Sequence, residues 1–211
     1  MIIVERTAKS HKLHLILLIL FILAYAVSAI KPRSYYIWFY ESFPTVVGVL
    51  ILIVTYKKFR FTSFVYVLIL LMTIIMLMGA HYRYGHMPLF DWIKNSYGLR
   101  RNYYDRIGHF MQGFVPAFII REVLIRKFKF KKVKILPILV VCICLSISAF
   151  YEILEAGAGI ISRKPIEEFL ELQGDILDTQ WDMFMALIGA LVSVLIFYKI
   201  HDRHIYSLKV Q

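Results

Sequence analysis

Acidic, imidazole and amide side chains recur at helical spacing at the ends of three apolar stretches of the sequence. Residues three or four positions apart share one face of a helix, so each set would project from one side of its helix. The sets are Asp105 with His109 and Gln112, Glu152 with Glu155, and Asp178 with Asp182.

Three uses fit this chemistry. Carboxylates and imidazole are oxygen and nitrogen donors that suit a divalent metal, and helix bundles build such sites from facing helices. Without a metal, crowded carboxylates can share protons near neutral pH and supply an acid and a base. The third use is to bind a cationic or hydroxyl-rich lipid headgroup without chemistry.

The predicted catalytic residues, which are also the predicted metal ligands, are Asp105, His109, Glu152 and Asp182. The predicted substrate-binding residues are Gln112, Glu155, Gln173, Asp178 and Trp181.

Structural roles compete with these functional ones. Asp105 and Asp178 stand at the starts of their stretches, where acids often cap a helix or interact with its dipole. His109 is equally compatible with a ligand, a base or a hydrogen-bonded structural histidine. Glu152 and Asp182 lie deeper in their stretches, where a functional or buried-network role is favoured.

The elements that position these residues are apolar enough to cross a membrane. The chain has 211 residues, of which 60% are hydrophobic and 18% charged, and its mean hydropathy is +0.67. Soluble domains have roughly 50% apolar and about 25% charged residues. Continuous apolar runs of about 20 residues match the thickness of the hydrocarbon core and argue against a β-barrel. We therefore predict an all-α polytopic bundle forming one integral membrane domain over residues 1–211.

About six spans are expected. The first stretch resembles a signal peptide but is long for one, so we expect it to remain as an uncleaved span. Glu41 and Pro44 interrupt the start of the second. The expected spans are Leu13–Ile30, Tyr36–Tyr56, Ser63–Ala80, Ile107–Ile125, Ile135–Ile153 and Trp181–Ile200.

The distribution of basic residues predicts the orientation. Lys and Arg are more numerous in the two tails and in the second and fourth connections than in the other connections. The positive-inside rule therefore places both termini in the cytoplasm. This topology puts the polar ends of the last three spans at one depth near the outer surface, facing the bundle interior rather than lipid.

The net charge of +11 does not indicate nucleic-acid binding. Basic residues gather in short connections such as "RKFKFKKVK" and "YKKFR", where membrane topology and anionic headgroups explain them. The sequence also lacks H-E-x-x-H, G-x-S-x-G and P-loop motifs. Cys142 and Cys144 lie two residues apart within a span and predict neither a disulfide nor a metal knuckle.

Two connections could contribute to the site. The third, residues 81–106, is rich in aromatics and suits an interfacial belt, or it forms a lid with His81, His86 or Asp91 reaching in. The fifth, residues 162–179, predicts a short amphipathic segment after Pro165. Its solvated face would carry Glu167, Glu168 and Glu171.

Four segments resemble a known family. "HYRYGHMPLFDWI", "RNYYDRIGHFMQGF", "EILEAGAG" and "QGDILDTQWDMFMALIGA" are similar to the YjdF family of bacterial inner-membrane proteins over most of the chain. The resemblance implies a multi-pass protein of the bacterial inner membrane and no established activity.

The second half more distantly resembles VanZ-like membrane proteins of the cell envelope. Asp105, His109, Glu152, Asp178 and Gly189 match that pattern. Arg106 stands where VanZ-like proteins have Lys, Glu155 for Gln, Asp182 for Asn and Met185 for Gly. The departures make this site more acidic, which favours a cation and separates it from the VanZ-like substrate.

Three functional hypotheses follow. The first is a membrane-embedded hydrolase or transferase acting on a lipid or lipid-linked envelope substrate, with or without a divalent metal. The second is a non-enzymatic protein that binds lipid headgroups or takes part in envelope interactions. A small transporter ranks third, because the inner halves of the spans are nearly devoid of polar groups. Membrane lipids are the expected partners in every case.

Overall fold

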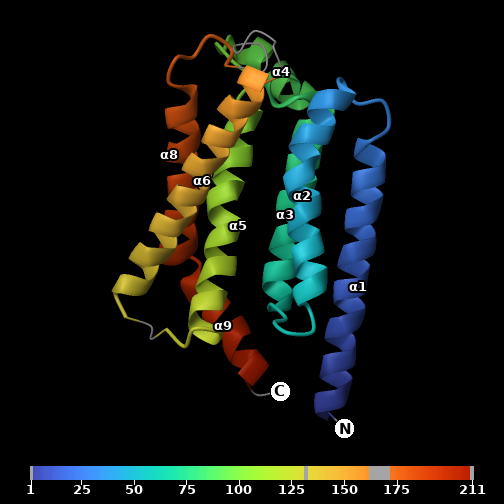
Figure 1. Cartoon of the computed structure of the whole chain (residues 1–211), viewed down its shortest axis with the longest axis vertical. Coiled ribbons are helices and arrows are strands. Elements are labelled where there is room, and N and C mark those ends of the chain that lie inside the picture. Colours follow the sequence, from blue (N-terminus) through green and yellow to red (C-terminus); the bar gives the residue numbers. More distant parts are fainter. Residues whose placement is uncertain (1, 131–132, 162–171, 210–211) are drawn as a thin grey trace. The chain divides into compact units, whose positions relative to one another are not determined.

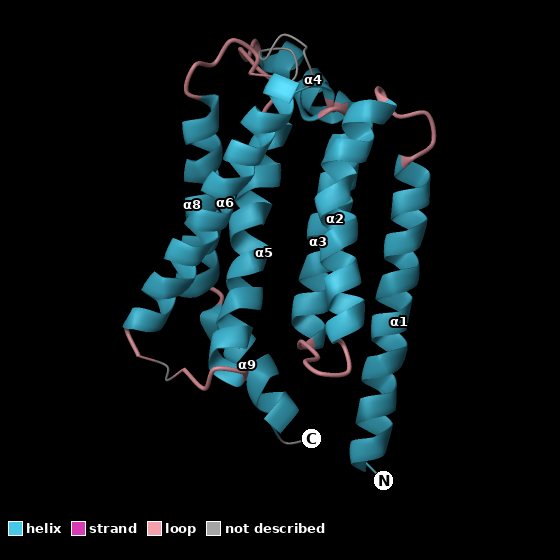
Figure 2. Ribbon diagram, in the orientation of Figure 1, coloured by secondary structure: helices cyan, strands magenta, loops and turns pink. Residues whose placement is uncertain are grey.

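The computed structural model describes residues 2–130, 133–161 and 172–209 of the 211-residue chain. All secondary structure in these ranges is helical, as predicted (Figure 2). The helices belong to two compact units, Met1–Arg83 with Phe197–Gln211 (unit 1) and Tyr84–Ile196 (unit 2). The expectation of a single membrane domain stays a prediction.

Unit 1 contains the first three long helices and the last helix. They are α1 (Ile2–Ser28), α2 (Tyr35–Thr55), α3 (Ser63–Tyr82) and α9 (Tyr198–Lys209). The hydroxyls of Ser34 and Thr62 accept hydrogen bonds from the first turns of α2 and α3 and so cap both helices. Both α1 and α2 pack against α3, and α9 touches α3.

Unit 2 contains the elements that carry the predicted site. They are the short 3-10 helix η1 (Tyr84–His86), α4 (Pro88–Tyr97), α5 (Tyr104–Arg126), α6 (Ile135–Ile161) and α8 (Asp178–Leu195). The helices α5, α6 and α8 pack pairwise. Figure 1 shows that α5 and α8 run in the same direction and α6 in the opposite one. The starts of α5 and α8 and the end of α6 therefore lie at one end of unit 2.

Four helices are long and apolar enough to cross a membrane: α1 over Ser10–Ser28, α2, α3 and α6. Across their break, α8 and α9 meet the same test only as a pair, which gives up to five candidate spans in the described ranges. The helix α5, which contains the predicted span Ile107–Ile125, is not among these candidates. Charged residues stand near both of its ends, with Asp105 and Arg106 at its start and Arg121 and Glu122 near its end. The prediction of six spans and of cytoplasmic termini stays a prediction.

Some predicted boundaries differ from the structure. The last predicted span, Trp181–Ile200, is interrupted, because α8 ends at Leu195 and α9 begins at Tyr198. The polar run from His201 to His204 does not suit the hydrocarbon core, and α9 is instead amphipathic. The third connection contains η1 and α4, and α6 continues to Ile161. The amphipathic segment with Glu167, Glu168 and Glu171 lies outside the described residues.

Candidate functional site

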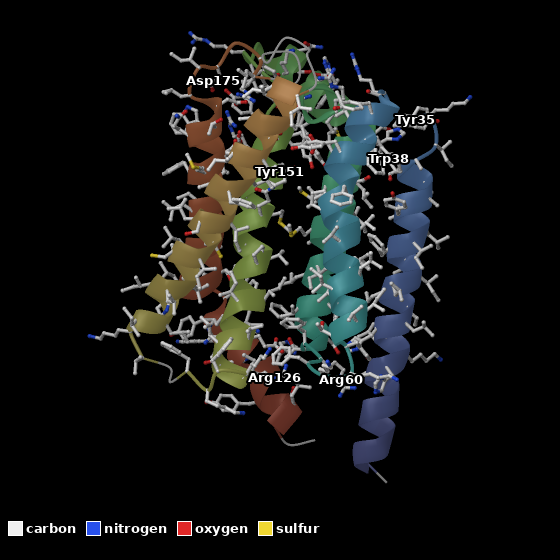
Figure 3. The ribbon with its side chains drawn as sticks, viewed as in Figure 1. Tyr35, Trp38, Arg60, Arg126, Tyr151 and Asp175 are labelled. Carbon is white, nitrogen blue, oxygen red and sulfur yellow. The ribbon has the colours of Figure 1, made fainter. Side chains whose placement is uncertain are left out.

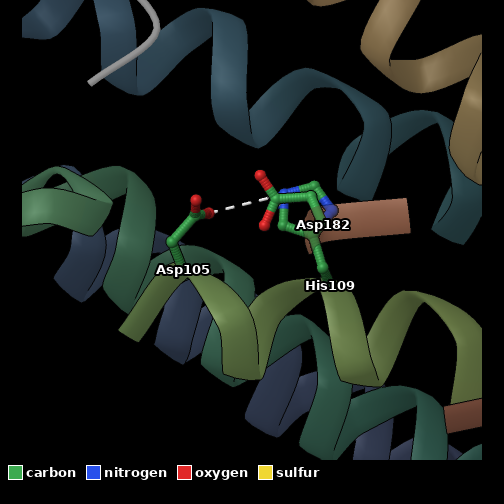
Figure 4. Close-up of side chains that lie close together, drawn as sticks. All are labelled: Asp105, His109 and Asp182. Atoms are coloured by element: carbon green, nitrogen blue, oxygen red, sulfur yellow. Dashed lines mark ion pairs between the residues drawn. The ribbon is translucent and has the colours of Figure 1, made fainter. Parts of the chain in front are cut away.

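The first turns of α5 and α8 bring two of the predicted acids and the predicted imidazole together. Asp105 and His109 occupy the first two turns of α5, and Asp182 lies in the second turn of α8. One ligand atom from each of these three side chains lies within 4.8 Å of the other two. Figure 4 shows the three side chains gathered between the two helices. We call Asp105, His109 and Asp182 the carboxylate–imidazole trio.

His109 occupies the centre of the site. Its Nε2 atom lies 3.4 Å from Oδ1 of Asp105 and 3.6 Å from Oδ1 of Asp182. On the other side of the ring, Nδ1 lies 3.5 Å from Oε1 of Glu152 in α6. The imidazole therefore faces three carboxylates from three helices. The predicted convergence of Asp105, His109, Glu152 and Asp182 is present in this geometry.

Several polar atoms of the site are buried without a hydrogen bond. His109 is 5% exposed and Glu152 is 8% exposed, yet His109 Nδ1 and Glu152 Oε1 have no hydrogen-bond partner among the described residues. The same is true of Gln112 Oε1, and of Ser148 Oγ one turn before Glu152. Buried polar groups in proteins are nearly always paired, and the exceptions are often functional. These atoms are therefore available to a ligand.

Two buried arginines neutralise part of the acidic cluster. The side chains of Arg101 and Arg106 both hydrogen-bond to Oδ1 of Asp178, and Arg106 Nη1 also donates to Oδ1 of Asp182. Asp175 Oδ2 lies 3.3 Å from Arg101 Nη1 and 3.4 Å from Arg106 Nη2. The bidentate geometry of guanidinium suits such shared carboxylates. We call Arg101 and Arg106 the arginine pair.

The cluster still holds more acids than arginines. The arginine pair faces Asp175 and Asp178 directly, and Asp105 Oδ2 lies 3.9 Å from each arginine. Asp182 and Glu152 add two further carboxyl groups, which makes five acids against two arginines. With five ionised carboxylates and a neutral His109 the net charge would be −3, and with a protonated His109 it would be −2. With all five carboxylates ionised, such a site would attract a cation.

A side-chain clamp holds the start of α5 against the segment before α8. The side-chain oxygen of Gln173 accepts a hydrogen bond from the Asn102 backbone N–H at 2.8 Å, and its nitrogen donates to the Asn102 carbonyl at 3.1 Å. The Asn102 side chain donates to the Met87 carbonyl and to Oδ1 of Asp91, both at 3.0 Å. The clamp therefore ties α4 to the edge of the site.

Glycines set the distance between α5 and α8. A β-carbon on Gly113 would lie 1.8 Å from the carbonyl oxygen of Ala186, and one on Gly189 would lie 2.1 Å from that of Phe110. These distances are far below van der Waals contact, so the two helices touch backbone to backbone. Small residues allow such an approach between membrane helices. The close contact lies directly beneath the trio and brings the polar first turns of both helices together.

The remaining predicted residues have different positions. Asp178 is 4% exposed and binds the arginine pair rather than serving as a solvent-exposed cap. Gln173 contacts Asn102, as part of the clamp. Glu155 is half-buried on α6, and Trp181 is 47% exposed with its ring against Phe184. The substrate-binding roles of these residues stay predictions.

Asp91 of α4 links the third connection to the site. Asp91 accepts a hydrogen bond from the Asn102 side chain, whereas Nδ1 of His81 lies 2.9 Å from the Ser28 carbonyl oxygen in unit 1. On α4, Trp92 is 63% exposed and Tyr97 is 74% exposed, which suits the predicted interfacial belt. Figure 3 labels Asp175, next to the clamp, and Tyr151, whose ring centroid lies 6.3 Å from that of His109.

Sequence reasoning did not assign Arg101, Asn102 or Arg106 to the site, although it aligned Arg106 with the Lys of the VanZ-like pattern. The arginines of "LRRNYYDR" were counted as basic residues of the third connection when the orientation was predicted. They were therefore not expected to be buried. One signal was present: Arg101 and Asp105 are four residues apart, the spacing of an ion pair on a helix.

The fold and the site define a class, the polytopic helical membrane proteins with a buried polar cluster near one end of a bundle. A family model described as "Predicted membrane protein (DUF2238)" matches residues 13–203, and the chain belongs to this family. The inner membrane protein YjdF of Escherichia coli (strain K12) is 39% identical over 168 residues, which cover 80% of each chain. The chain is thus a multi-pass inner-membrane protein, as the resemblance implied.

No solved structure matches the chain. The more distant resemblance to VanZ-like proteins is not tested by these comparisons and stays an expectation.

Proposed function

We propose that this protein is a membrane-embedded hydrolase or transferase that binds a divalent metal at the carboxylate–imidazole trio and acts on a lipid or lipid-linked substrate. The observation that carries the proposal is the 4.8 Å limit within which ligand atoms of Asp105, His109 and Asp182 lie. Two carboxylates and one imidazole are a donor set that divalent transition metals accept. Three protein ligands leave coordination positions open, as catalytic sites require.

The residues around the trio suit metal-assisted chemistry. A bound divalent ion would polarise a substrate oxygen or activate a water, which is the chemistry that such ions supply. Glu152 lies on the opposite side of His109 from the trio carboxylates and is available to orient the imidazole or to accept a proton. The excess of acids over arginines supports a cationic ligand.

Metal binding by the purified full-length chain tests the proposal. Calorimetric titration with Mn²⁺ or Zn²⁺ after chelation should give about one ion per chain, and elemental analysis should find the ion after gel filtration. His109→Ala and Asp182→Asn should abolish binding. Asp202→Asn in α9 is the control, because it changes an acid of unit 1, outside the trio and the clamp, and should bind normally. Absence of saturable binding by the unaltered protein would remove the metal from the proposal.

The second candidate is a protein that binds a cationic headgroup without chemistry. The specific observation in its favour is the same negative excess, which an aminophospholipid headgroup would neutralise. The two candidates differ at Asp182. If Asp182→Asn retains the cellular function of the chain, headgroup binding is favoured, since an amide still accepts hydrogen bonds but is a poor metal ligand. Lipid profiling of a deletion strain with and without this variant makes the comparison.

A further inference from the structure

Unit 1 contains a pocket that the proposed function does not use. It has a volume of about 280 Å³ and lies among α1, α2 and α3. Small-molecule sites in proteins start at roughly 300 Å³ and are mostly apolar with a few polar groups. This pocket has the same composition, since aliphatic and aromatic side chains form its walls and His11, His14 and Tyr56 form one end.

The pocket exists because α1 and α2 are joined at their ends and separated between them. Both helices pack along α3 but have little direct contact with each other. At one end the Trp38 indole N–H donates to the Ser28 hydroxyl at 3.1 Å. At the other end Tyr56, the residue that follows α2, contacts His14 of α1, with 2.7 Å between the phenol oxygen and Nδ1. Trp38 and Arg60, labelled in Figure 3, mark these two ends.

The polar end is a continuous hydrogen-bonded chain. His14 Nε2 lies 2.9 Å from the Ser63 hydroxyl, and the Tyr56 hydroxyl lies 3.0 Å from His11 Nδ1. His11 Nε2 in turn lies 2.8 Å from Nη1 of Arg60. Arg60 follows Lys57 and Lys58 in the short connection between α2 and α3. We call Lys57, Lys58 and Arg60 the basic turn, and it adjoins the polar end of the pocket.

The apolar part opens outward from unit 1. Leu15 of α1 and Ile53 of α2 both line the pocket, yet they are 57% and 49% exposed. All three surrounding helices are long and apolar enough to cross a membrane. The medium outside such helices is lipid, so an acyl chain can enter between α1 and α2 without crossing water.

We propose that this pocket binds one acyl chain of an anionic phospholipid, with the lipid phosphate at the basic turn. The apolar walls match the chain, and Arg and Lys side chains are the usual partners of phosphate. Under the predicted orientation the basic turn faces the cytoplasmic leaflet, where anionic lipids concentrate. The site is separate from the carboxylate–imidazole trio and does not depend on the function proposed for it.

The test places a large side chain inside the pocket. The control places the same side chain on the exposed face of the same helix. Leu70 lines the pocket, whereas the next residue, Leu71, is 48% exposed and does not. Full-length protein is purified in mild detergent with dioleoyl phosphatidylglycerol, and retained lipid is counted by native mass spectrometry. Leu70→Trp should lower the retained fraction about fivefold or more, since the indole takes the space of the chain, and Leu71→Trp should leave it unchanged. Equal retention by both variants would overturn the proposal.

A second pair of variants, on α2, tests the proposal if the Leu70→Trp variant does not fold. Val49 lines the pocket on α2, and Leu50 beside it is 54% exposed. Val49→Phe should lower retention and Leu50→Phe should not, with gel filtration as the check on folding. If Val49→Phe folds and retains lipid normally, the pocket does not hold the chain.

The headgroup is tested with the basic turn. Competition between phosphatidylglycerol and phosphatidylcholine gives the preference for the anionic lipid. The double variant Lys57→Gln, Lys58→Gln should reduce this preference about fivefold or more, because two cations near the phosphate are removed. Lys31→Gln with Arg33→Gln is the control, because these cations precede α2 at its other end. An unchanged preference in the Lys57, Lys58 variant would overturn the assignment of the phosphate.

Discussion

Gly113 of α5 meets the backbone of Ala186 of α8 so closely that no side chain fits between them. A β-carbon at Gly113 would lie 1.8 Å from the Ala186 carbonyl oxygen, and Gly189 repeats the arrangement against Phe110 at 2.1 Å. These obstacles are backbone atoms, which cannot turn away as a flexible side chain can. The spacing between α5 and α8 therefore requires glycine at both positions, and that spacing holds His109 opposite Asp182.

Replacement of either glycine by alanine should destabilise unit 2. We expect Gly113→Ala and Gly189→Ala each to lower the free energy of unfolding by about 1–3 kcal/mol or more, because the helices must move apart. Denaturant titration followed by circular dichroism measures the loss. Gly157→Ala in α6 is the control, since nothing lies within 4 Å of its added β-carbon. Similar stabilities for all three variants would contradict the backbone contact.

Loss of one arginine should leave buried acids without a partner. Arg106 binds Asp178 and Asp182, and all three are buried. Removing one member of a buried ion pair costs about 3–5 kcal/mol, so Arg106→Gln should unfold at a markedly lower denaturant concentration. Arg100→Gln, one residue from Arg101 but exposed, should resemble the unaltered protein. Equal midpoints would show that Arg106 is not paired in the folded protein.

Glu152 should be separable from the metal ligands. It contacts His109 Nδ1 but is not one of the trio whose ligand atoms lie within 4.8 Å of one another. Glu152→Gln should raise the metal dissociation constant by about tenfold, the lower end of effects seen for residues that orient a ligand. Asp182→Asn should raise it well beyond that. The reverse order, measured by calorimetric titration, would make Glu152 the ligand in place of Asp182.

Asn102 should control the mobility of α4. Its side chain holds the Met87 carbonyl and the Asp91 carboxylate, both at 3.0 Å. Asn102→Ala removes both bonds, so backbone amides over Pro88–Tyr97 should exchange with deuterium faster, about tenfold for each 1.4 kcal/mol lost. Asn95→Ala changes an exposed asparagine of α4 itself and should leave exchange as it is. If exchange in α4 is unaltered in the Asn102 variant, the clamp does not hold the helix.

The orientation of the chain in the membrane can be measured with reporter proteins fused after Gln211 and after Asn95. The positive-inside rule predicts cytoplasmic termini, so green fluorescent protein fused after Gln211 should fluoresce and alkaline phosphatase there should be inactive. Fusion of the same reporters after Asn95 should give the opposite pattern. Phosphatase activity from the fusion at Gln211 would reverse the topology or change the number of spans.

The helical fold class could be predicted from the sequence. So could the placement of the polar groups at one depth, at the same end of their helices. Apolar runs located α2, α3 and the first part of α6 closely, because hydropathy is a property of the segment itself. The spacing of Asp105 and His109 predicted a shared helix face. The convergence of Glu152 and Asp182 on that face depended on the helix directions, which the order of the spans supplies.

The parts that could not be predicted depend on distances between helices. Nothing local to Gly113 or Gly189 indicates which backbone it meets. Arg101 and Arg106 resembled solvated connection residues, because Asp178, the acid that both of them bind, lies more than 70 positions later in the sequence. The break after Leu195 was hidden by continued hydropathy up to Ile200, whereas the polar residues that follow were a signal for an amphipathic helix.

The contacts between the start of α5 and the start of α8 have a consequence for the order in which the cluster forms during synthesis. Arg101 and Arg106 leave the ribosome long before Asp175, Asp178 and Asp182 have been synthesised. Among the described acids that contact the two arginines, Asp105 alone is made before Asp175. The cluster is thus completed late in synthesis, and a chain cut short before Asp175 would carry two guanidinium groups against the single carboxylate of Asp105.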